Sequence, residues 1–252
     1  MRTTGNTILI TGGGSGIGRG LAEAFHALGN KVIIAGRRKR VLDEVTAANP
    51  GIASLTLHIE SATRIRTFAA QVVKDYPALN VLINNAGIMR PENLKARARD
   101  LTDSEAIVAT NLLGPIRLTA ALLPRLQKQA RPVIMNVSSG LAFVPLAMTP
   151  TYCATKAAIH SYTQSLRQQL AETSTEVIEL IPPYVGTELM AGGTSNARAM
   201  PLDKFIAEVM AILKAQPSVK EVCVENVKPL RFAAENGRYD AIFQGLNAQS
   251  FH

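Results

Sequence analysis

Residues 7–18 read Thr-Ile-Leu-Ile-Thr-Gly-Gly-Gly-Ser-Gly-Ile-Gly, and this stretch decides the fold of the chain. Its first five residues are apolar or β-branched, which predicts a buried strand. A glycine-rich turn follows, and the residues from there to Leu28 have the apolar spacing of a helix. This order is typical of a dinucleotide-binding unit, because the turn admits a pyrophosphate to the backbone and the helix N-terminus favours its charge.

The same alternation of strand and helix continues along the chain. We expect strands near residues 7–11, 31–36, 54–59, 80–84, 132–137, 176–181 and 219–224. Between them lie helical patterns. One ends near Ala48, and the others cover residues 61–76, 102–129, 157–170 and 201–215. The sequence therefore predicts an α/β protein: a single doubly wound Rossmann domain over residues 1–252, with about seven parallel strands and helices on both faces.

Composition limits the classes of protein that this chain can belong to. With 252 residues, 47% hydrophobic and 18% charged, it suits one globular domain with a sizeable core. No uninterrupted apolar run approaches the roughly 20 residues that span a bilayer, and the N-terminus has no apolar signal core. Two cysteines form neither a metal pattern nor a disulfide framework. We expect a cytoplasmic protein with no membrane segment and no metal.

The net charge of +8 raises the question of nucleic-acid binding. The basic residues are dispersed apart from the run 37–40, and the chain has no Trp to stack on bases. An anionic small molecule explains that run more economically. A nucleic-acid-binding module remains an alternative that a salt-dependent gel shift tests.

Tyr152 and Lys156 are candidates for acid–base chemistry. They are four residues apart at the start of a helical pattern, so their side chains share one face. A cation beside a phenol favours the phenolate and lowers its pKa toward the operating range. Ser139 lies thirteen residues upstream, in a Ser-Ser-Gly loop after a buried strand. Ligands of open α/β sheets bind at that end of the strands, so the three groups could converge on one reacting oxygen.

In these motifs the chain resembles the short-chain dehydrogenase/reductase family, from Thr7 to about Val224. The resemblance implies a catalytic centre made of Ser139, Tyr152 and Lys156, completed by Asn111, which holds a relay water that reaches Lys156. It also implies NAD(P)-dependent hydride transfer to or from a small carbonyl or alcohol substrate, and a homodimer or homotetramer. Within the family, the segment 84–91 and the C-terminal tail resemble the DltE-like oxidoreductase subgroup.

The resemblance further implies a set of cofactor-binding residues. Gly12, Gly16 and Gly18 fit the T-G-x-x-x-G-x-G form of the family, and residues 84–87 match its N-N-A-G motif. Tyr152 and Lys156 also face the nicotinamide ribose. The remaining residues implied are Ser15, Ile17, Arg37, Arg38, His58, Ile59, Asn85, Ala86, Gly87, Pro182, Val185 and Thr187.

The second strand ends in Gly36-Arg37-Arg38, where an acidic residue would favour a free ribose hydroxyl. Arginine can pair with a 2′-phosphate, so NADP(H) is preferred over NAD(H). Two positions depart from the family pattern. His58 replaces an Asp that contacts adenine, and Pro183 replaces a Gly, which removes a backbone donor.

Residues 188–215 are expected to form a substrate lid, and residues 228–252 a tail that is the least family-like part. The candidate pocket walls are mainly apolar: Ile88, Met89, Leu141, Phe143, Val144, Met148, Tyr184, Leu189 and Met190. A regulatory protein that senses NADP(H) without turnover is an alternative from another class. A sugar epimerase or dehydratase is disfavoured, because the chain lacks the extra substrate domain expected there.

Overall fold

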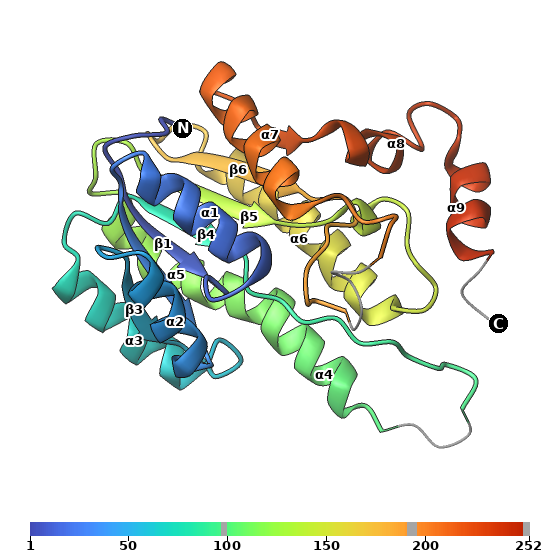
Figure 1. The fold of residues 1–252 in the computed structure, drawn as a ribbon, viewed down its shortest axis with the longest axis horizontal. Coiled ribbons are helices and arrows are strands. Elements are labelled where there is room, and N and C mark those ends of the chain that lie inside the picture. The colour runs from blue at the N-terminus through green and yellow to red at the C-terminus, as the bar shows by residue number, and fades with distance from the viewer. Residues whose placement is uncertain (97–99, 191–195, 249–252) are drawn as a thin grey trace.

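Seven parallel strands form one sheet at the centre of the molecule (Figure 1). The structure is a computed structural model and describes residues 1–96, 100–190 and 196–248. The strand order is β3-β2-β1-β4-β5-β6-β7. The chain adds β2 and β3 on one side of β1 and adds β4 to β7 on the other, so the order switches between β1 and β4. The strands are β1 Thr7–Thr11, β2 Lys31–Gly36, β3 Ala53–Thr56, β4 Val81–Asn84, β5 Val133–Val137, β6 Glu176–Ile181 and β7 Glu221–Cys223. This confirms the predicted doubly wound fold.

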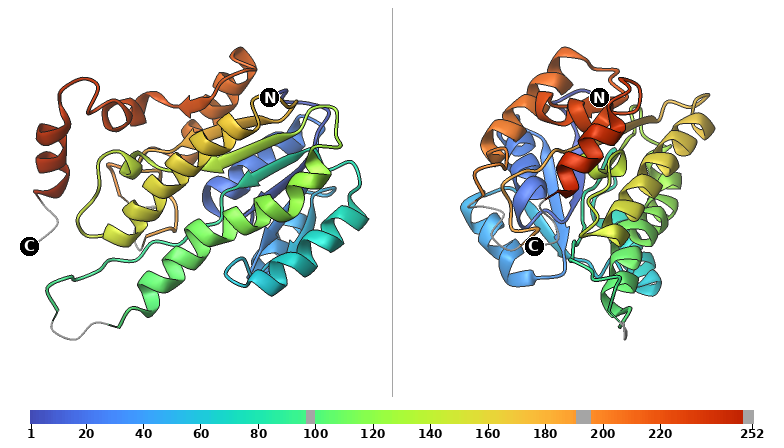
Figure 2. Two further views of the ribbon diagram at one scale, coloured as in Figure 1. Left: turned by 180° about the vertical axis from the view of Figure 1, so that it is seen from behind. Right: turned by 90° about the vertical axis from the view of Figure 1, so that its right-hand side faces the viewer.

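Helices cover both faces of the sheet (Figure 2). They are α1 Gly16–Ala27, α2 Lys39–Ala48, α3 Ala62–Asp75, α4 Thr102–Val108, α5 Gly114–Leu126, α6 Pro150–Gln169, α7 Leu202–Ala215, α8 Lys228–Arg231 and α9 Tyr239–Asn247. The core splits accordingly: α1, α2 and α7 pack on one face of the sheet and α3, α5 and α6 on the other. Alternate residues of a strand face opposite sides, so β1 places Ile8 and Ile10 in the first core and Leu9 in the second.

Two strands are shorter than predicted. β3 ends at Thr56, which pairs with Gly36, the last residue of β2. A ladder cannot extend beyond its partner strand, so the predicted strand 54–59 stops early and His58 and Ile59 lie in the connection after it. β7, at the edge of the sheet, is likewise reduced to Glu221–Cys223.

The predicted helix over 102–129 has a break in its middle. Residues Ala109–Leu113 form a π-helical turn between α4 and α5, and Gly114 donates its N–H to the carbonyl of Ala109. Pro115 explains this locally, because it has no N–H to donate to the carbonyl of Asn111. The turn widens the helix at Asn111, as π-turns often do at functional sites.

By length and composition alone, the 25-residue stretch Thr102–Leu126 could cross a membrane. In the fold, Ile107 is buried beside the helix α6, and Leu118, Leu122 and Leu126 belong to the core on the sheet. Leu113 within this stretch, and Leu101 just before it, are exposed.

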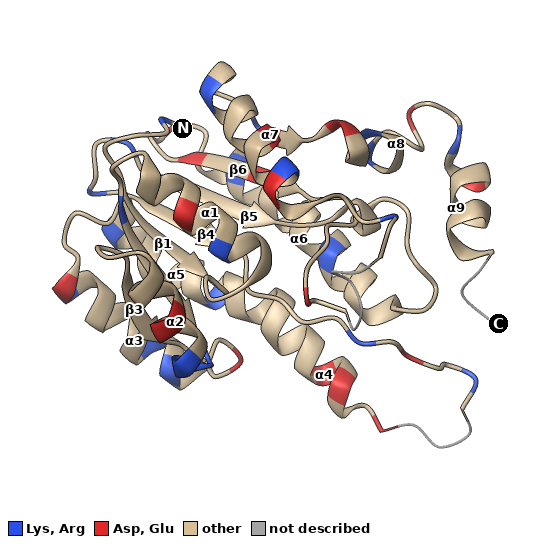
Figure 3. Ribbon diagram, in the orientation of Figure 1, with Lys and Arg blue, Asp and Glu red and all other residues tan. Residues whose placement is uncertain are grey.

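Charged residues are spread over most elements of the described chain (Figure 3). The basic run at 37–40 is partly compensated on α2, where Lys39 pairs with Asp43 and Arg40 with Glu44, each one helical turn away. Arg37 and Arg38 precede that helix, at the carboxyl end of β2.

Candidate active site

Tyr152 and Lys156 lie on consecutive turns near the start of α6. The helix begins at Pro150, earlier than predicted, because proline suits the first turn and Glu92 caps the free amides there. Glu92 accepts hydrogen bonds from the Thr151 backbone N–H at 2.9 Å and from its hydroxyl at 2.8 Å. The Lys156 ammonium is 5.6 Å from the centre of the Tyr152 ring, and both residues are only 5% exposed.

Burial dominates the electrostatics of this pair. It lowers the pKa of Lys156 to about 8, against the opposing effect of the negative charge of Glu179. Burial also raises the pKa of the Tyr152 phenol, while a hydrogen bond with the Ser139 side chain lowers it. The net direction for the Tyr152 pKa is therefore the reverse of the expected one, because desolvation of the phenolate outweighs the lowering by Ser139.

Ser139 lies at the carboxyl end of β5, where the strand turns into a short 3₁₀ helix, Gly140–Ala142. Its Oγ accepts a hydrogen bond from the Leu141 N–H at 3.1 Å, which fixes the side chain. Its hydroxyl is close enough to the Tyr152 phenol to lower the pKa of that group, so the two candidate catalytic hydroxyls lie together across the loop 143–149. The structure therefore brings Ser139 and Tyr152 together as the sequence predicted.

Asn111 and Lys156 line a common narrow pocket behind Tyr152. The pocket is lined by Asn84, Ala86, Asn111, Pro115, Asn136, Val137, Lys156 and Ile159. Lys156 Nζ donates to the carbonyl of Val137 at 2.8 Å. The Asn111 side chain accepts from the Ile88 N–H and donates to the Ile88 carbonyl, each at 2.9 Å. The amide thus anchors the segment that follows the N-N-A-G motif, and the relay water stays a prediction.

The glycine motif lies against the other predicted cofactor residues. Gly12 and Gly16 have left-handed backbone conformations, with φ of 68° and 51°. A Cβ on Gly12 would lie 2.9 Å from the Ala86 Cα, and one on Gly16 would lie 3.3 Å from Thr187. Only glycine leaves this space open between the first loop, the N-N-A-G turn and Thr187. Ile17 and Gly18 open the helix α1 behind it.

Arg38 reaches back to the same loop. Its Nη2 donates to the Oγ of Ser15, the residue before α1, at 3.5 Å. Arg37 is exposed at the carboxyl end of β2, next to the end of β3 in the sheet. His58 and Ile59 follow β3, and His58 Nδ1 lies 3.4 Å from a carboxylate oxygen of Glu60. The predicted adenosine-side residues therefore gather at one edge, with Glu60 as an acidic neighbour that the sequence interpretation missed.

The turn after β6 is tied to the serine loop and to the predicted lid. Pro182 accepts a hydrogen bond from the Gly140 N–H at 2.9 Å. Val185 forms an isolated parallel bridge with Met200, so the two ends of segment 185–200 are joined at its base. Residues 191–195 of the predicted lid lie outside the described residues. Thr187 is at the start of that segment, facing Gly16.

The sequence interpretation also missed Asn247, at the end of α9. Its side chain accepts from the Ala147 N–H at 2.7 Å and donates to the Pro145 carbonyl at 3.1 Å. On the other side of the same loop, Leu146 N–H donates to the thiol of Cys153 at 3.3 Å. The tail thus clamps the loop between Ser139 and Tyr152, and one hundred residues of sequence separation left no local signal of it.

The fold and the site define a Rossmann-type dinucleotide-binding protein, and comparison with known proteins identifies the family. The short chain dehydrogenase model matches residues 6–198. The chain is 38% identical to "Uncharacterized oxidoreductase DltE" of Bacillus subtilis (strain 168), over 99% of each chain. The chain belongs to the short-chain dehydrogenase family and is an oxidoreductase.

Solved structures of the same fold agree with this. A short chain dehydrogenase from Burkholderia cenocepacia J2315 in complex with NADP superposes with a TM-score of 0.81 at 24% identity, covering 98% of this chain and 99% of that one. The 3-ketoacyl-(acyl-carrier-protein) reductase from Brucella melitensis, complexed with NADH, has a TM-score of 0.77 at 27% identity and coverage of 87% and 96%. A nicotinamide cofactor therefore fits this fold.

Proposed function

We propose that the protein transfers a hydride between NADP(H) and a carbonyl or alcohol substrate, with Tyr152 as the proton donor and acceptor. One observation carries the proposal: Ser139, Tyr152 and Lys156 are buried together at the carboxyl end of β5, with the Lys156 ammonium 5.6 Å from the centre of the Tyr152 ring. This is where open α/β sheets bind their ligands. The residues are the right types for proton transfer to an oxygen.

In the reducing direction each residue has a distinct role. Tyr152 gives its phenolic proton to the carbonyl oxygen, which Ser139 holds and polarises through its hydroxyl. Lys156 stabilises the phenolate that remains, because its ammonium is a cation that lies over the Tyr152 ring. Asn111 supports the opposite side of the Lys156 pocket and holds the water that returns the proton. NADPH, when bound, supplies the hydride.

The cofactor residues fit a dinucleotide through their shape. The space that a Cβ would fill at Gly12 and Gly16 admits a pyrophosphate to the backbone at the N-terminus of α1. Arg37 and Arg38 support the preference for NADP(H), because their guanidinium groups can pair with a 2′-phosphate. The backbone at Ile59 and at residues 85–87 would face the adenosine half, and Val185 and Thr187 the nicotinamide half.

The substrate is expected to be a carbonyl compound with apolar groups. Tyr184 and Leu189 are exposed near the predicted lid, while Met89, Leu141 and Met190 pack beside Tyr152. Apolar walls around one buried polar centre favour such a substrate. The two cysteines are free thiols, which is consistent with the cytoplasmic location that we infer.

We further propose a homodimer that forms through α4 and α6. Leu101 and Leu113 are 49% and 37% exposed, and they flank a hollow of about 430 Å³ on the surface of these helices. The hollow is lined by Leu101, Ser104, Glu105, Val108, Ala109, Leu113 and Thr151. A second copy would cover this apolar surface and the start of the helix that carries Tyr152.

The function is tested by following NADPH absorbance with a panel of ketones and aldehydes. Tyr152→Phe should bind NADPH as the parent does and reduce an active substrate at least about a hundredfold more slowly. Tyr162→Phe is the matched control, since Tyr162 is on the same helix and hydrogen-bonds Thr119 in the core. A Tyr152→Phe variant with parental turnover contradicts the mechanism. NADPH binding without turnover across the panel would favour the sensing protein instead.

A further inference from the structure

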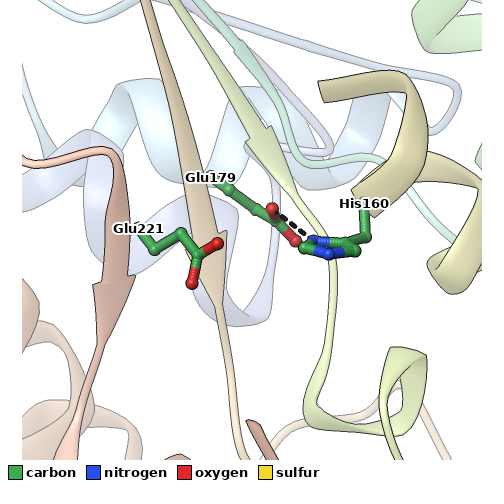
Figure 4. Close-up of side chains that lie close together, drawn as sticks. All are labelled: His160, Glu179 and Glu221. Carbon is green, nitrogen blue, oxygen red and sulfur yellow. Dashed lines mark hydrogen bonds and ion pairs between the residues drawn. The ribbon is translucent and has the colours of Figure 1, made fainter. Parts of the chain in front are cut away.

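Glu179 is a fully buried carboxylate that the proposed mechanism does not use. It lies in β6 with no exposed surface, and its neighbours His160 and Glu221 come from α6 and β7 (Figure 4). A buried carboxylate is costly unless its oxygens are hydrogen-bonded. Each oxygen of Glu179 has such a partner, so the contacts show what this residue holds together.

One oxygen of Glu179 accepts from the Ser138 hydroxyl at 2.5 Å, and the other lies 2.8 Å from His160 Nδ1. His160 Nε2 is 3.1 Å from the side-chain nitrogen of Gln164. An imidazole proton on Nδ1 points to the carboxylate, so His160 donates to Glu179. The two oxygens of Glu179 thus hold the loop after β5 at Ser138 and the helix α6 at His160.

Both partners of Glu179 are next to proposed catalytic residues. Ser138 precedes Ser139, and His160 is one helical turn after Lys156 on the same face of α6. Three consecutive residues at the end of β5 thus make separate contacts: Val137 with Lys156, Ser138 with Glu179, and Ser139 with Tyr152. Glu179 also contacts His160, so it connects Ser138 to the helix α6 that carries Tyr152 and Lys156.

The same side chains could be read as a metal site, since ligand atoms of His160, Glu179 and Glu221 lie within 4.8 Å of one another. Glu221, however, is held by Arg231 through two contacts of 2.7 and 3.2 Å. The guanidinium compensates the charge of Glu221 and takes up the oxygens that a cation would need. The cluster is better described as a hydrogen-bond network in which Glu221 is paired with Arg231, and Glu179 is bound by Ser138 and His160.

We propose that Glu179 is a positioning residue, which fixes the serine loop to α6 through Ser138 and His160 and whose negative charge favours the ammonium form of Lys156. The inference rests on the proposed function, because it acts through Ser139 and Lys156. The charged and titratable groups around Glu179 are Lys156 and His160 on α6, Glu221 and Cys223 on β7, and Arg231 and Glu235 in and after α8. Of these, Lys156 is the group with a direct role in the reaction.

The test separates the charge of Glu179 from its hydrogen bonds. Glu179→Gln keeps the shape and can still accept from Ser138, but it removes the charge. Ser138→Ala keeps the charge and removes the link to the serine loop. Glu221→Gln is the matched control, because it neutralises a neighbouring carboxylate that is bound to Arg231.

The first readout needs no substrate. Protein labelled with ¹³C at the lysine ε-carbon is titrated by NMR, and the Lys156 signal is assigned by its loss in Lys156→Arg. The Lys156 midpoint should move to lower pH in Glu179→Gln, because the charge that favours the ammonium is gone. It should stay at the parental pH in Ser138→Ala and Glu221→Gln. An unchanged midpoint in Glu179→Gln overturns the electrostatic part of the inference.

The second readout is turnover of a carbonyl that the parent reduces. Glu179→Gln and Ser138→Ala should lower kcat about tenfold or more, with NADPH affinity unchanged, since displacement of a reacting group slows the chemical step. Activity falls on the alkaline side of the pH profile, and in Glu179→Gln this fall should begin at a lower pH than in the parent. Parental kcat in Ser138→Ala and in His160→Ala, which remove the two hydrogen bonds to Glu179, overturns the positioning role, even if Glu179→Gln does not fold. If the parent reduces no carbonyl, the proposed function fails while the lysine titration still decides the effect of Glu179.

Discussion

The Lys156 ammonium lies 5.6 Å from the centre of the Tyr152 ring, and both side chains are excluded from solvent. The protein alone therefore holds a cation and a phenol together in a medium that penalises the charged form of each. A bound nicotinamide ribose and substrate would replace part of the lost solvation with hydrogen bonds. Burying this pair lowers the stability of the fold, and it places the two groups for the proposed proton transfer.

That cost leads to the first prediction, which concerns Lys156→Met. The ammonium has a pKa of about 8 when folded and 10.5 as its ordinary value, a difference worth roughly 3 kcal/mol at ~1.36 kcal/mol per unit. The variant also loses the hydrogen bond to Val137, worth about 1 kcal/mol. Lys156→Met should thus be more stable than the parent by roughly 2 kcal/mol at pH 7, measured by urea unfolding, and catalytically inactive.

The pH dependence of this difference has a definite sign. Lys156 binds its proton less tightly in the folded than in the unfolded chain, so the unfolded parent takes up more protons between pH 8 and 10.5. The parent should therefore gain stability relative to Lys156→Met as the pH rises through that range. Tyr152, whose pKa is raised by burial, is present in both proteins, so its effect largely cancels in the difference. A difference that does not change with pH would contradict the assignment.

The second prediction concerns cofactor choice. Arg37→Ala should weaken NADPH binding about ten- to a hundredfold, because a charge-assisted hydrogen bond contributes roughly 1.5–3 kcal/mol. NADH has no 2′-phosphate and should lose much less. Both nucleotides are titrated by calorimetry, with Arg40→Ala as the control, since Arg40 pairs with Glu44 on the outer face of α2. Equal losses for NADPH and NADH would mean that Arg37 contacts only the adenine.

The third prediction concerns assembly. Leu113→Glu places a charge in the apolar hollow between α4 and α6, and burying it in a dimer would be costly. The variant should have half the parental mass in sedimentation experiments while it keeps the parental circular dichroism. Leu28→Glu, a change at an exposed leucine after α1, should leave the mass unchanged. A parental mass for Leu113→Glu would place the interface elsewhere.

The fourth prediction concerns the clamp between α9 and loop 145–147. Asn247→Ala removes two hydrogen bonds from that loop, so we expect KM for the carbonyl to rise about tenfold. NADPH affinity should not change, because the Asn247 side chain hydrogen-bonds this loop and Phe243 rather than the proposed cofactor-binding residues. Asn236→Ala, at an exposed position of the same tail, is the control. If KM stays parental in both variants, the tail does not shape the substrate site.

Much of the fold could be predicted because its signals are local. The bounds of β2 and β6 match the predicted runs 31–36 and 176–181, since each is an apolar stretch limited by turn residues. The position of the candidate site could be predicted as well, because a parallel sheet places the carboxyl ends of its strands along one edge. The residues Ser139, Tyr152 and Lys156 are brought together as expected.

The parts that could not be predicted depend on distant contacts. The direction of the Tyr152 pKa depends on how deeply the phenol is buried, which no local pattern states. Asn247 lies one hundred residues from its partners, and Glu179 looks like an ordinary polar interruption in a strand. The π-helical turn at Asn111 combines the missing N–H of Pro115 with a side-chain contact to Ile88.

That π-helical turn has a consequence for how the length of this chain can vary. A π-turn contains one residue more than an α-helical turn, so deletion of a single residue within Ala109–Leu113 would restore a continuous helix. The wide turn absorbs the extra residue, so α4 and α5 already have nearly the phase that a continuous α-helix would give them. Ile107 would therefore stay in the interior, and the same side of α4 would face outward. A one-codon deletion can thus remove the wide turn at Asn111 while every strand and the outer face of α4 stay in place.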